Sequence, residues 1–597
     1  MKRLKISPND NQKNSIRLIL LFSVVFNLLA YLAVIAIYPP VWYTNDDYRM
    51  MTIASGAYTG TPSADIVFMR YPIGLMLSAL YSLTTQVPWY GLFTMLCMFV
   101  PSCIFCYYIV KKAYMKNYTL FGVCIYALAF LFLIRKYICL PQFTLTSAFM
   151  GTGAIVLIYE MPSSKNIRHI VFAVICAVLS FSIRSKAFYL LLPLIALIVI
   201  VRLVNEKGTK IWKPFLSVCL ATLVLCGSVY AVDCLAWNRS EEYQNFKEFN
   251  KARSEAFDYG SIPSYYDNMP FYVENGISEV TYRALSARYF DVDDSVDAET
   301  LQTIADYIDE VRSQSGSFFD RLITAFEETI DYWFKSGDNI VKFVSLYVFV
   351  MLAVVLIMSV RKKKINIIFP AAVAGFILES VYLSFSGRIV VRVVDMMLLA
   401  AGIVGSITIV DMLKVRRKTF REYCSVLWKS KAKFASMLLG GLSVVAIVCS
   451  SILSMSAAVK VKYEAVAVTL NTRINTLKDY AEFYPDAFFF YDSNDFISCT
   501  DYVFKTYDEG EILNNDSLGS WNCTSPTYYE RNAQYGFTSA IDGLISDDCD
   551  VYFVAAKSVR MGMTKTLKDK YNKKLKLVDS VQSNNYVLHI YMVVDDD

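Results

Sequence analysis

Two adjacent carboxylates, Asp46 and Asp47, lie in the stretch YTNDDYRMMTIASGAYTG (43–60), directly after the first apolar segment of the chain. Asn45 and Asp46 are of types that cap helices, and Gly56 is of the type that ends them, so the stretch predicts a short helix. A carboxylate held at the edge of a bilayer can also take a proton from an incoming acceptor. The pair therefore admits a structural and a chemical role, and the choice depends on which side of the membrane it faces.

A second set of charges lies at the ends of apolar segments that we place on the same side as the carboxylates. Its basic members are Arg70, Arg135, Lys136, Arg184, Lys186, Arg388 and Arg392. Each one alone is typical of an anchor to lipid headgroups. Together, and facing two carboxylates, they favour an anionic lipid-phosphate substrate, because arginine holds phosphate through paired hydrogen bonds.

Glu379 lies within an apolar segment, about two helical turns before Arg388. An unpaired carboxylate at that depth is costly. We therefore expect Glu379 either to pair with Arg388 or Arg392 or to help shape a polar cavity.

The composition indicates a polytopic membrane protein with soluble parts. The 597 residues are 55% hydrophobic and 19% charged, and the mean hydropathy is +0.39. The net charge of +5 is small and the basic residues lie in short loops, so no nucleic-acid partner is predicted. We expect membrane lipids as neighbours.

Histidine and cysteine do not indicate a metal site. The two histidines, His169 and His589, lie far apart in the sequence. We predict no metal ligands and no cofactor, and metal dependence is left open. Cys499, Cys523 and Cys549 fall in the polar C-terminal part, where two of them could form a disulfide outside the cytoplasm.

Basic residues that flank apolar segments predict the topology, because they concentrate in the cytoplasm. The basic N-terminus is therefore expected inside, and Asp46 and Asp47 outside. The segment 71–86 is short and is predicted not to cross. About eleven spans follow, at about 16–38, 89–110, 118–134, 141–159, 167–183, 187–204, 214–236, 340–360, 365–385, 393–411 and 434–457.

The predicted domains are a membrane domain, 1–457, and a C-terminal domain, 458–597, outside the membrane. The membrane domain includes a first external loop, 39–88, with the acidic pair, and an acidic, mostly helical external insert, 237–338. In the C-terminal part, DAFFFYDS, DVYFVAAK and NYVLHIYMVV read as strands and MTKTLKDKYNKK as a helix, which predicts a small α/β domain. The stretch LGSWNCTSPTYYERNAQYGF is predicted to be a surface loop, either plain or in contact with glycan.

The order of these parts resembles the GT-C class of integral membrane glycosyltransferases, which take sugars from polyprenyl phosphates at the outer face. The corresponding elements are NDDYRMMTIASGAYTG, RYPIGLMLSALYSL, KKAYMKN and RKYICLPQFTLTSAF. The chain is similar more specifically to a group of uncharacterised bacterial membrane proteins with the same NDD loop, an E…YL…GR…R corner and a trailing LGxW…SP domain. The resemblance implies a mainly α, polytopic fold of GT-C type in a bacterial plasma membrane.

The resemblance also implies inverting transfer of a sugar from a polyprenyl-phosphate donor to an envelope glycan, lipid or protein. Asp46 or Asp47 would act as general base, while the basic residues stabilise the departing phosphate. Adjacent residues of a helix diverge by about 100°, so we expect one carboxylate to face the site, and we favour Asp46. The class commonly has Asp-Glu or Glu-x-Asp at this place, so Asp-Asp is a variant.

Two other interpretations stay open. In a non-catalytic envelope scaffold or glycan-binding protein, the acidic pair would be a helix cap and the basic residues would anchor lipids. In a lipid-linked oligosaccharide transporter or polymerase, function would depend on Glu379 and other polar groups inside the spans.

Overall fold

The computed structural model describes residues 10–162, 166–206, 210–335, 339–362, 366–415, 449–450, 452–465, 473–495, 500–556, 559–583 and 586–596. The predicted span at 434–457 lies largely outside the described residues, and Cys499 lies wholly outside them. Cys523 and Cys549, which are described, are both free thiols.

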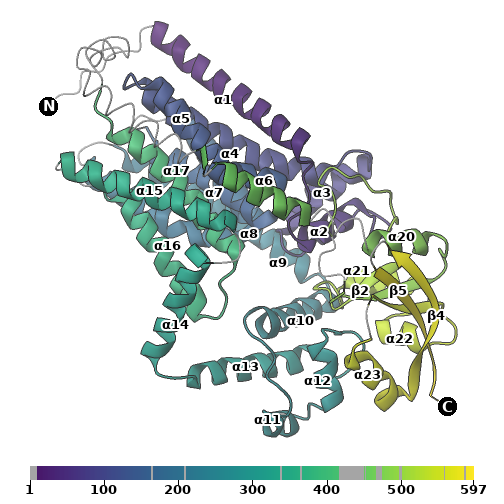
Figure 1. Ribbon diagram of the computed structural model, residues 1–597. Coiled ribbons are helices and arrows are strands. Elements are labelled where there is room, and N and C mark those ends of the chain that lie inside the picture. Colours follow the sequence, from purple (N-terminus) through teal and green to yellow (C-terminus); the bar gives the residue numbers. More distant parts are fainter. Residues whose placement is uncertain are drawn as a thin grey trace.

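The apolar helices gather in one bundle (Figure 1). Eight of the described helices are long and apolar enough to cross a membrane, which confirms a mainly helical, membrane-embedded protein. They are α1 (Asp10–Ile37), α4 (Trp89–Tyr114), the continuous run of α5 (Thr119–Ala129), η1 (Phe130–Ile134) and α6 (Arg135–Cys139), then α8 (Ile167–Asn205), α9 (Trp212–Trp237), α15 (Asn339–Lys362), α16 (Ile368–Phe385) and α17 (Val391–Met412). Almost every side chain of α17 is buried, so this helix lies in the interior of the bundle.

Three shorter helices belong to the same part of the chain: α2 (Asn45–Ser55), α3 (Tyr71–Leu83) and α7 (Phe143–Tyr159). The 13 residues of α3 are fewer than the roughly 20 that a span needs, in agreement with the prediction that 71–86 does not cross. All 17 residues of α7, predicted as the span 141–159, are buried among other helices.

The helix α8 folds back on itself at Arg184. As one straight helix its 39 residues would extend about 58 Å, nearly twice the thickness of a bilayer core. Arg184 has φ −155° and ψ 93°, which interrupts the helix. His169, near the start of α8, and Arg202, near its end, both donate hydrogen bonds to carbonyl groups at the C-terminal end of α7 (2.6 and 2.9 Å). The two limbs are therefore antiparallel, and they match the predicted spans 167–183 and 187–204.

The insert between α9 and α15 is helical, as its sequence predicts. Its elements are α10 (Glu241–Asp258), α11 (Met269–Glu274), α12 (Glu279–Ser286), α13 (Ala298–Gln314), α14 (Phe318–Ile330) and the π-helical turn η2 (Asp331–Lys335). Buried apolar side chains join α10 to α13, among them Phe249, Ile304 and Ile308. The helices α10 to α13 lie together on one side of the membrane bundle (Figure 1).

The C-terminal part contains a five-stranded sheet in the order β2-β1-β3-β5-β4. Its elements are α20 (Arg473–Glu482), β1 (Phe488–Asp492), β2 (Asn515–Leu518), α21 (Pro526–Ala533), α22 (Ala540–Ile545), β3 (Val551–Ala555), α23 (Met561–Tyr571), β4 (Lys573–Ser583) and β5 (Tyr586–Asp595). The predicted strands correspond to β1, β3 and β5 and the predicted helix to α23, whereas β2 and β4 were missed. Strands β2, β1 and β3 run parallel, while β5 pairs antiparallel with β3 and β4.

The strand β1 is buried on both faces, which explains the unbroken run of aromatic residues before Asp492. Phe488 and Phe490 pack in the cluster that contains residues of α21, α22 and α23. Phe489 and Tyr491 point to the other face, where they pack in the cluster that contains residues of α20. The sheet is therefore covered by helices on both sides.

The insert and the sheet domain share one apolar core. Ala284 and Tyr289 of the insert belong to the same buried cluster as Phe553 and Met563 of the sheet domain. Together they form one unit at one side of the membrane bundle (Figure 1).

Candidate functional site

The acidic pair begins the helix α2. Its N-cap is Thr44, and its C-cap is Gly56 at φ 82°. A Cβ atom on Gly56 would lie 2.6 Å from the carbonyl carbon of Thr61, so only glycine fits this close turn. The short helix is therefore present as predicted, although Thr44 rather than Asn45 precedes its first turn.

Asp47 is buried and has a structural role. Its carboxylate accepts hydrogen bonds from Tyr90 Oη and the backbone N–H of Phe143, both at 3.1 Å, and from Thr44 Oγ1 at 3.3 Å. Burial raises the pKa of Asp47 well above its ordinary value, and the neighbouring Asp46 adds to the rise. Asp47 thus holds α2 against α4 and α7 and has no free face toward a substrate.

Asp46 faces a cavity instead. It is partly exposed, and among the described residues none donates a hydrogen bond to its carboxylate. Burial raises the pKa of Asp46, and the positive charges of Arg392 and Arg184 offset that rise in part. A carboxylate without a protein hydrogen bond is free to accept one from a bound molecule.

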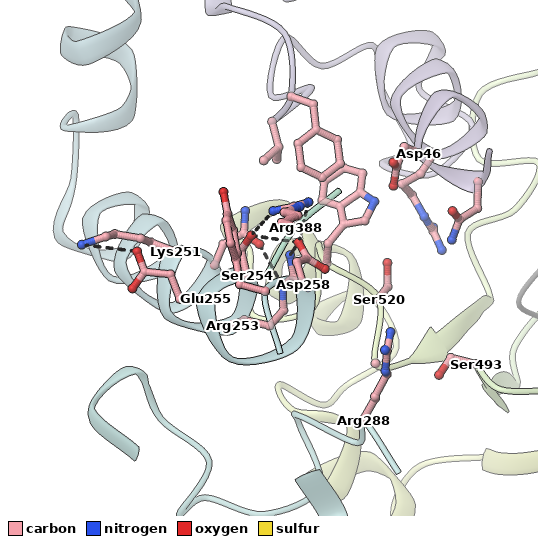
Figure 2. Close-up of a pocket in the computed structure, with 18 of the residues that line it drawn as sticks. Asp46, Lys251, Arg253, Ser254, Glu255, Asp258, Arg288, Arg388, Ser493 and Ser520 are labelled. Atoms are coloured by element: carbon pink, nitrogen blue, oxygen red, sulfur yellow. Dashed lines mark hydrogen bonds and ion pairs between the residues drawn. The ribbon is translucent and has the colours of Figure 1, made fainter. Parts of the chain in front are cut away.

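The cavity has a volume of about 1050 Å³ and is built from three parts of the chain: the membrane domain, the insert and the sheet domain. Among the described residues that line it, ten are Lys or Arg and four are Asp or Glu, so its charge is strongly positive. Figure 2 shows Asp46 of α2 on one side of this space and Asp258 of α10 on another, with Arg388 beside Asp258. The geometry suits an anionic ligand with Asp46 beside it.

Arg184 reaches the cavity because α8 turns back at this residue. Its guanidinium lies over the rings of Phe68 and Phe143, 5.3 and 5.1 Å from their centroids. These two rings stack on each other at 5.7 Å, and Phe68 also contacts Trp521 of the sheet domain at 4.6 Å. Aromatic rings from the membrane and sheet domains thus fix the position of this arginine.

Arg388 and Arg392 come from the connection between α16 and α17. Arg388 Nη2 lies 3.2 Å from Asp258 Oδ2, and its guanidinium stacks over Tyr259 at 4.5 Å. Arg392 and Lys186 also line the cavity, and within the described residues no carboxylate forms an ion pair with either. Arg392 therefore keeps its charge available for a ligand.

The insert supplies cavity residues that the sequence interpretation missed. They lie on one face of α10, at spacings of three and four residues: Lys247, Asn250, Lys251, Ser254, Glu255 and Asp258. Arg253 and Arg288 also line the cavity, and Arg253 Nε donates to Asn250 Oδ1 at 3.0 Å. The helical periodicity of the polar residues was the available signal, but nothing in the sequence indicated which structure this face meets.

The sheet domain closes the cavity with Ser493, Asn494, Ser517, Gly519, Ser520 and Trp521. The prediction that 518–537 is a surface loop is therefore wrong. Trp521 and Cys523 are buried, and residues 526–533 form the helix α21. Its aromatic and turn residues pack against the insert and the membrane domain, which sequence periodicity cannot reveal.

Gly519 lies at a close backbone approach between the sheet domain and the insert. It has φ +96°, and a Cβ atom there would lie 2.1 Å from the carbonyl oxygen of Arg288. We expect Gly519→Ala to lower the free energy of unfolding by about 3 kcal/mol, because both the conformation and the clash are unfavourable. Thermal unfolding of the purified protein measures the loss.

Gly276→Ala is the matched control for Gly519→Ala. Gly276 also has a positive φ, +68°, but nothing lies within 4 Å of its Cβ position. This variant should lose only the conformational part, about 1 kcal/mol. Equal losses in the two variants would contradict the predicted close contact.

Asp516 of β2 binds the helix that carries Asp46. Its carboxylate is fully buried and accepts hydrogen bonds from Arg49 Nη2, Arg531 Nη2 and Tyr58 Oη, each at 2.7 Å. Burial alone would raise the pKa of Asp516, but the two arginines hold it below its ordinary value. Since Arg49 lies three residues after Asp46 on α2, the sheet domain directly supports the position of this carboxylate.

Besides Asp47, four predicted site residues do not line the cavity: Arg70, Arg135, Lys136 and Glu379. Arg70 Nη1 pairs with Asp233 Oδ2 of α9 at 2.6 Å. Arg135 Nη1 donates to Ser456 Oγ at 3.0 Å. Arg70 thus binds a helix of the bundle, whereas the Nε and Nη2 atoms of Arg135 are buried and have no hydrogen-bond partner among the described residues.

Lys136 and Glu379 also depart from the predicted arrangement. Lys136 is buried and pairs with Asp395 Oδ2 of α17 at 2.6 Å. The π-helical turn η1 lies directly before α6, and such a turn holds one more residue than an α-turn, which rotates the following side chains. Glu379 forms no ion pair with Arg388 or Arg392 among the described residues, and Arg388 pairs instead with Asp258 of the insert.

The described residues hold no group of three or more His, Cys, Asp or Glu that could bind a metal ion. Comparisons of the chain with protein-family models, with curated proteins and with solved structures found no match. The functional argument therefore depends on the geometry of the cavity.

Proposed function

We propose that the protein is a membrane glycosyltransferase that moves a sugar from a polyprenyl-phosphate donor to a glycan, lipid or protein of the cell envelope. The observation that supports this most is the setting of Asp46. Its carboxylate has no hydrogen-bond donor among the described residues and lies in a positively charged cavity with Arg184 and Arg392. A base beside cations at the ends of membrane helices suits a lipid-phosphate leaving group.

In the proposed reaction Asp46 removes the proton from an acceptor hydroxyl. The resulting oxygen attacks the anomeric carbon of the sugar from the face opposite the phosphate. The bond between that carbon and the phosphate oxygen breaks, and its electron pair leaves with the polyprenyl phosphate. Arg184 and Arg392 stabilise the negative charge on the departing phosphate, and the sugar configuration is inverted.

The proposal includes a topology. The N-terminus lies in the cytoplasm, and the cavity, the insert and the sheet domain lie on the outer face of a bacterial plasma membrane. The two limbs of α8 count as separate crossings, and about eleven crossings result when α7 and the segment 434–457 are included. The basic flanks of the apolar segments support this orientation.

Deletion of the gene in its own host tests the proposal. The sugar composition of the envelope glycans is compared in the deletion strain, with and without the wild-type protein. We expect one sugar to be missing in the deletion strain and restored by the wild-type protein. The polyprenyl-phosphate donor should accumulate in the deletion strain. Unchanged glycans and no donor accumulation would contradict transferase activity.

The same strains separate the two alternative functions. A scaffold would support full glycan assembly when Asp46 is replaced by Asn, since the carboxylate would only begin a helix. A transporter would depend on Glu379, whose Oε2 has no hydrogen-bond partner among the described residues. Glu379→Gln at wild-type abundance should leave a transferase active.

The pH dependence of transfer is predicted from the charges around Asp46. The base must be deprotonated, so kcat/KM should rise with pH through its raised pKa. Arg392→Gln removes a charge that lowers this pKa, so the acid limb of the profile should move to higher pH. Asp258→Asn removes a charge that raises it, so the limb should move to lower pH.

Asp267→Asn, at an exposed position of the insert, is the control for these profiles and should leave the limb in place. The position of the limb is compared rather than the maximal rate, because Arg392→Gln also weakens phosphate binding. If the acid limb moved in the same direction in Arg392→Gln and Asp258→Asn, the role of Asp46 as the base would be contradicted.

A further inference from the structure

The cavity contains more free positive charge than one lipid phosphate requires. Within the described part of the chain, no carboxylate forms an ion pair with Arg184, Lys186 or Arg392 of the membrane domain. The same holds for Lys247 and Arg288 of the insert. The first three lie at the ends of membrane helices, where a lipid phosphate would be held, so the cations of the insert are left for another ligand.

The wall formed by the sheet domain has the chemistry of a carbohydrate site. Ser493, Ser517, Ser520 and Trp521 line it, and the Trp521 ring packs against Phe68. The Ser493 Oγ is buried and has no hydrogen-bond partner among the described residues. Figure 2 shows Arg288 near Ser493 and Ser520. An unsatisfied hydroxyl beside a free cation indicates a ligand with both hydroxyl and anionic groups.

We propose that this side of the cavity binds an anionic glycan, a polymer of sugar or polyol units with phosphate or carboxylate groups. Its anionic groups lie against Lys247 and Arg288, and its hydroxyl groups bond to Ser493. On the proposed function, this polymer is the acceptor of the transferred sugar. Arg288 already lies over the Phe257 ring at 5.6 Å, but a neutral acceptor would leave both Lys247 and Arg288 without an anionic partner among the described residues.

Binding of oligomers to the full-length protein tests the proposal. The protein is held in phosphatidylcholine nanodiscs, and three probes of similar length are compared: a glycerol-phosphate oligomer, an oligomannuronate and a neutral malto-oligosaccharide. We expect at least one anionic probe to bind more tightly than the neutral probe, with affinity that falls as salt rises. The anionic probe that binds more tightly shows whether the site prefers phosphate or carboxylate groups. Equal binding of the neutral probe would overturn the proposal.

The double variant Lys247→Gln with Arg288→Gln should raise the Kd of the anionic probe about tenfold, since each exposed charge contributes modestly. The control Lys574→Gln with Lys576→Gln removes two charges from β4, away from the cavity, and should leave the Kd unchanged. Arg288→Lys, which keeps the charge, should preserve most of the affinity and checks that position for folding. An unchanged Kd in the double variant would overturn the proposal.

The binding assay separates this inference from the proposed function. Asp46→Asn should bind the anionic probe at least as well as the wild type, because the substitution removes a negative charge. If transfer depends on Asp46 but anionic probes do not bind preferentially, only the proposal of an anionic glycan is overturned. If the wild-type protein binds anionic probes preferentially but its deletion leaves the envelope sugars unchanged, the proposed transferase activity is contradicted instead.

Discussion

Asp46→Asn is expected to lower the rate of sugar transfer about a thousandfold, the usual contribution of a general base. The amide has nearly the same shape as the carboxylate but cannot accept the proton of the acceptor hydroxyl. Among the described residues none donates a hydrogen bond to Asp46, so the substitution should leave α2 folded. The rate is measured with membranes from the deletion strain at matched protein abundance.

Asp47→Asn is the informative partner of Asp46→Asn. Asp47 is buried, and the amide oxygen of asparagine can still accept from Tyr90 and from the N–H of Phe143. We expect some loss of stability but transfer within about tenfold of the wild type per folded molecule. A thousandfold loss in Asp47→Asn together with full activity in Asp46→Asn would assign the base to Asp47.

Asp516→Ala is expected to have the largest effect on stability, a loss of about 3–5 kcal/mol in the free energy of unfolding. The substitution leaves Arg49 and Arg531 as buried guanidinium groups without their carboxylate, and it removes the acceptor of Tyr58. Pulse proteolysis in urea, followed on the C-terminal domain, measures the loss. Because Arg49 lies on α2, the remaining folded protein should also transfer sugar more slowly.

Two control variants test whether the stability loss in Asp516→Ala comes from the buried network rather than from the removal of any carboxylate. Asp569→Ala, at an exposed position of α23, should change stability by less than about 0.5 kcal/mol. Replacement of the three charges together, by Arg49→Met, Asp516→Leu and Arg531→Met, should restore much of the stability because no buried charge is left unpaired. A loss below about 1 kcal/mol in Asp516→Ala would contradict the network.

The network also predicts a direction for acid sensitivity. The pKa of Asp516 is held below its ordinary value in the folded protein. Its contribution to stability is therefore present above the ordinary carboxyl pKa and is lost as the pH falls through the lower, folded value. A fall in pH should therefore destabilise the variant without the three charges less than it destabilises the wild type.

Local sequence signals predicted much of the fold. Apolar length predicted the membrane helices, and the change of pattern after residue 458 predicted a sheet domain. Gly56 marked the end of α2, where its positive φ is required. The strand β2, with the sequence NDSL, could not be predicted, since its polar residues are buried by partners far away in the sequence.

The candidate site could be predicted only in part, as the basic residues show. Arg184, Lys186, Arg388 and Arg392 do line the cavity with Asp46. Lys136 carries the same charge at a similar place in the sequence, yet it pairs with Asp395 inside the bundle. Charge and hydropathy patterns predict where a helix ends, but the partner of a side chain depends on how the helices rotate and pack.

The sequence alone determined that this is a membrane protein with a helical insert and a C-terminal α/β domain, and it singled out the acidic pair. Only the tertiary structure decided that Asp46 faces the cavity while Asp47 is bound by Tyr90 and Phe143. It also brought Arg253, Arg288 and Trp521 to the same space. The physical reason is that hydropathy and turn chemistry act over a few residues, whereas burial, ion pairing and charge in a cavity arise between segments hundreds of residues apart.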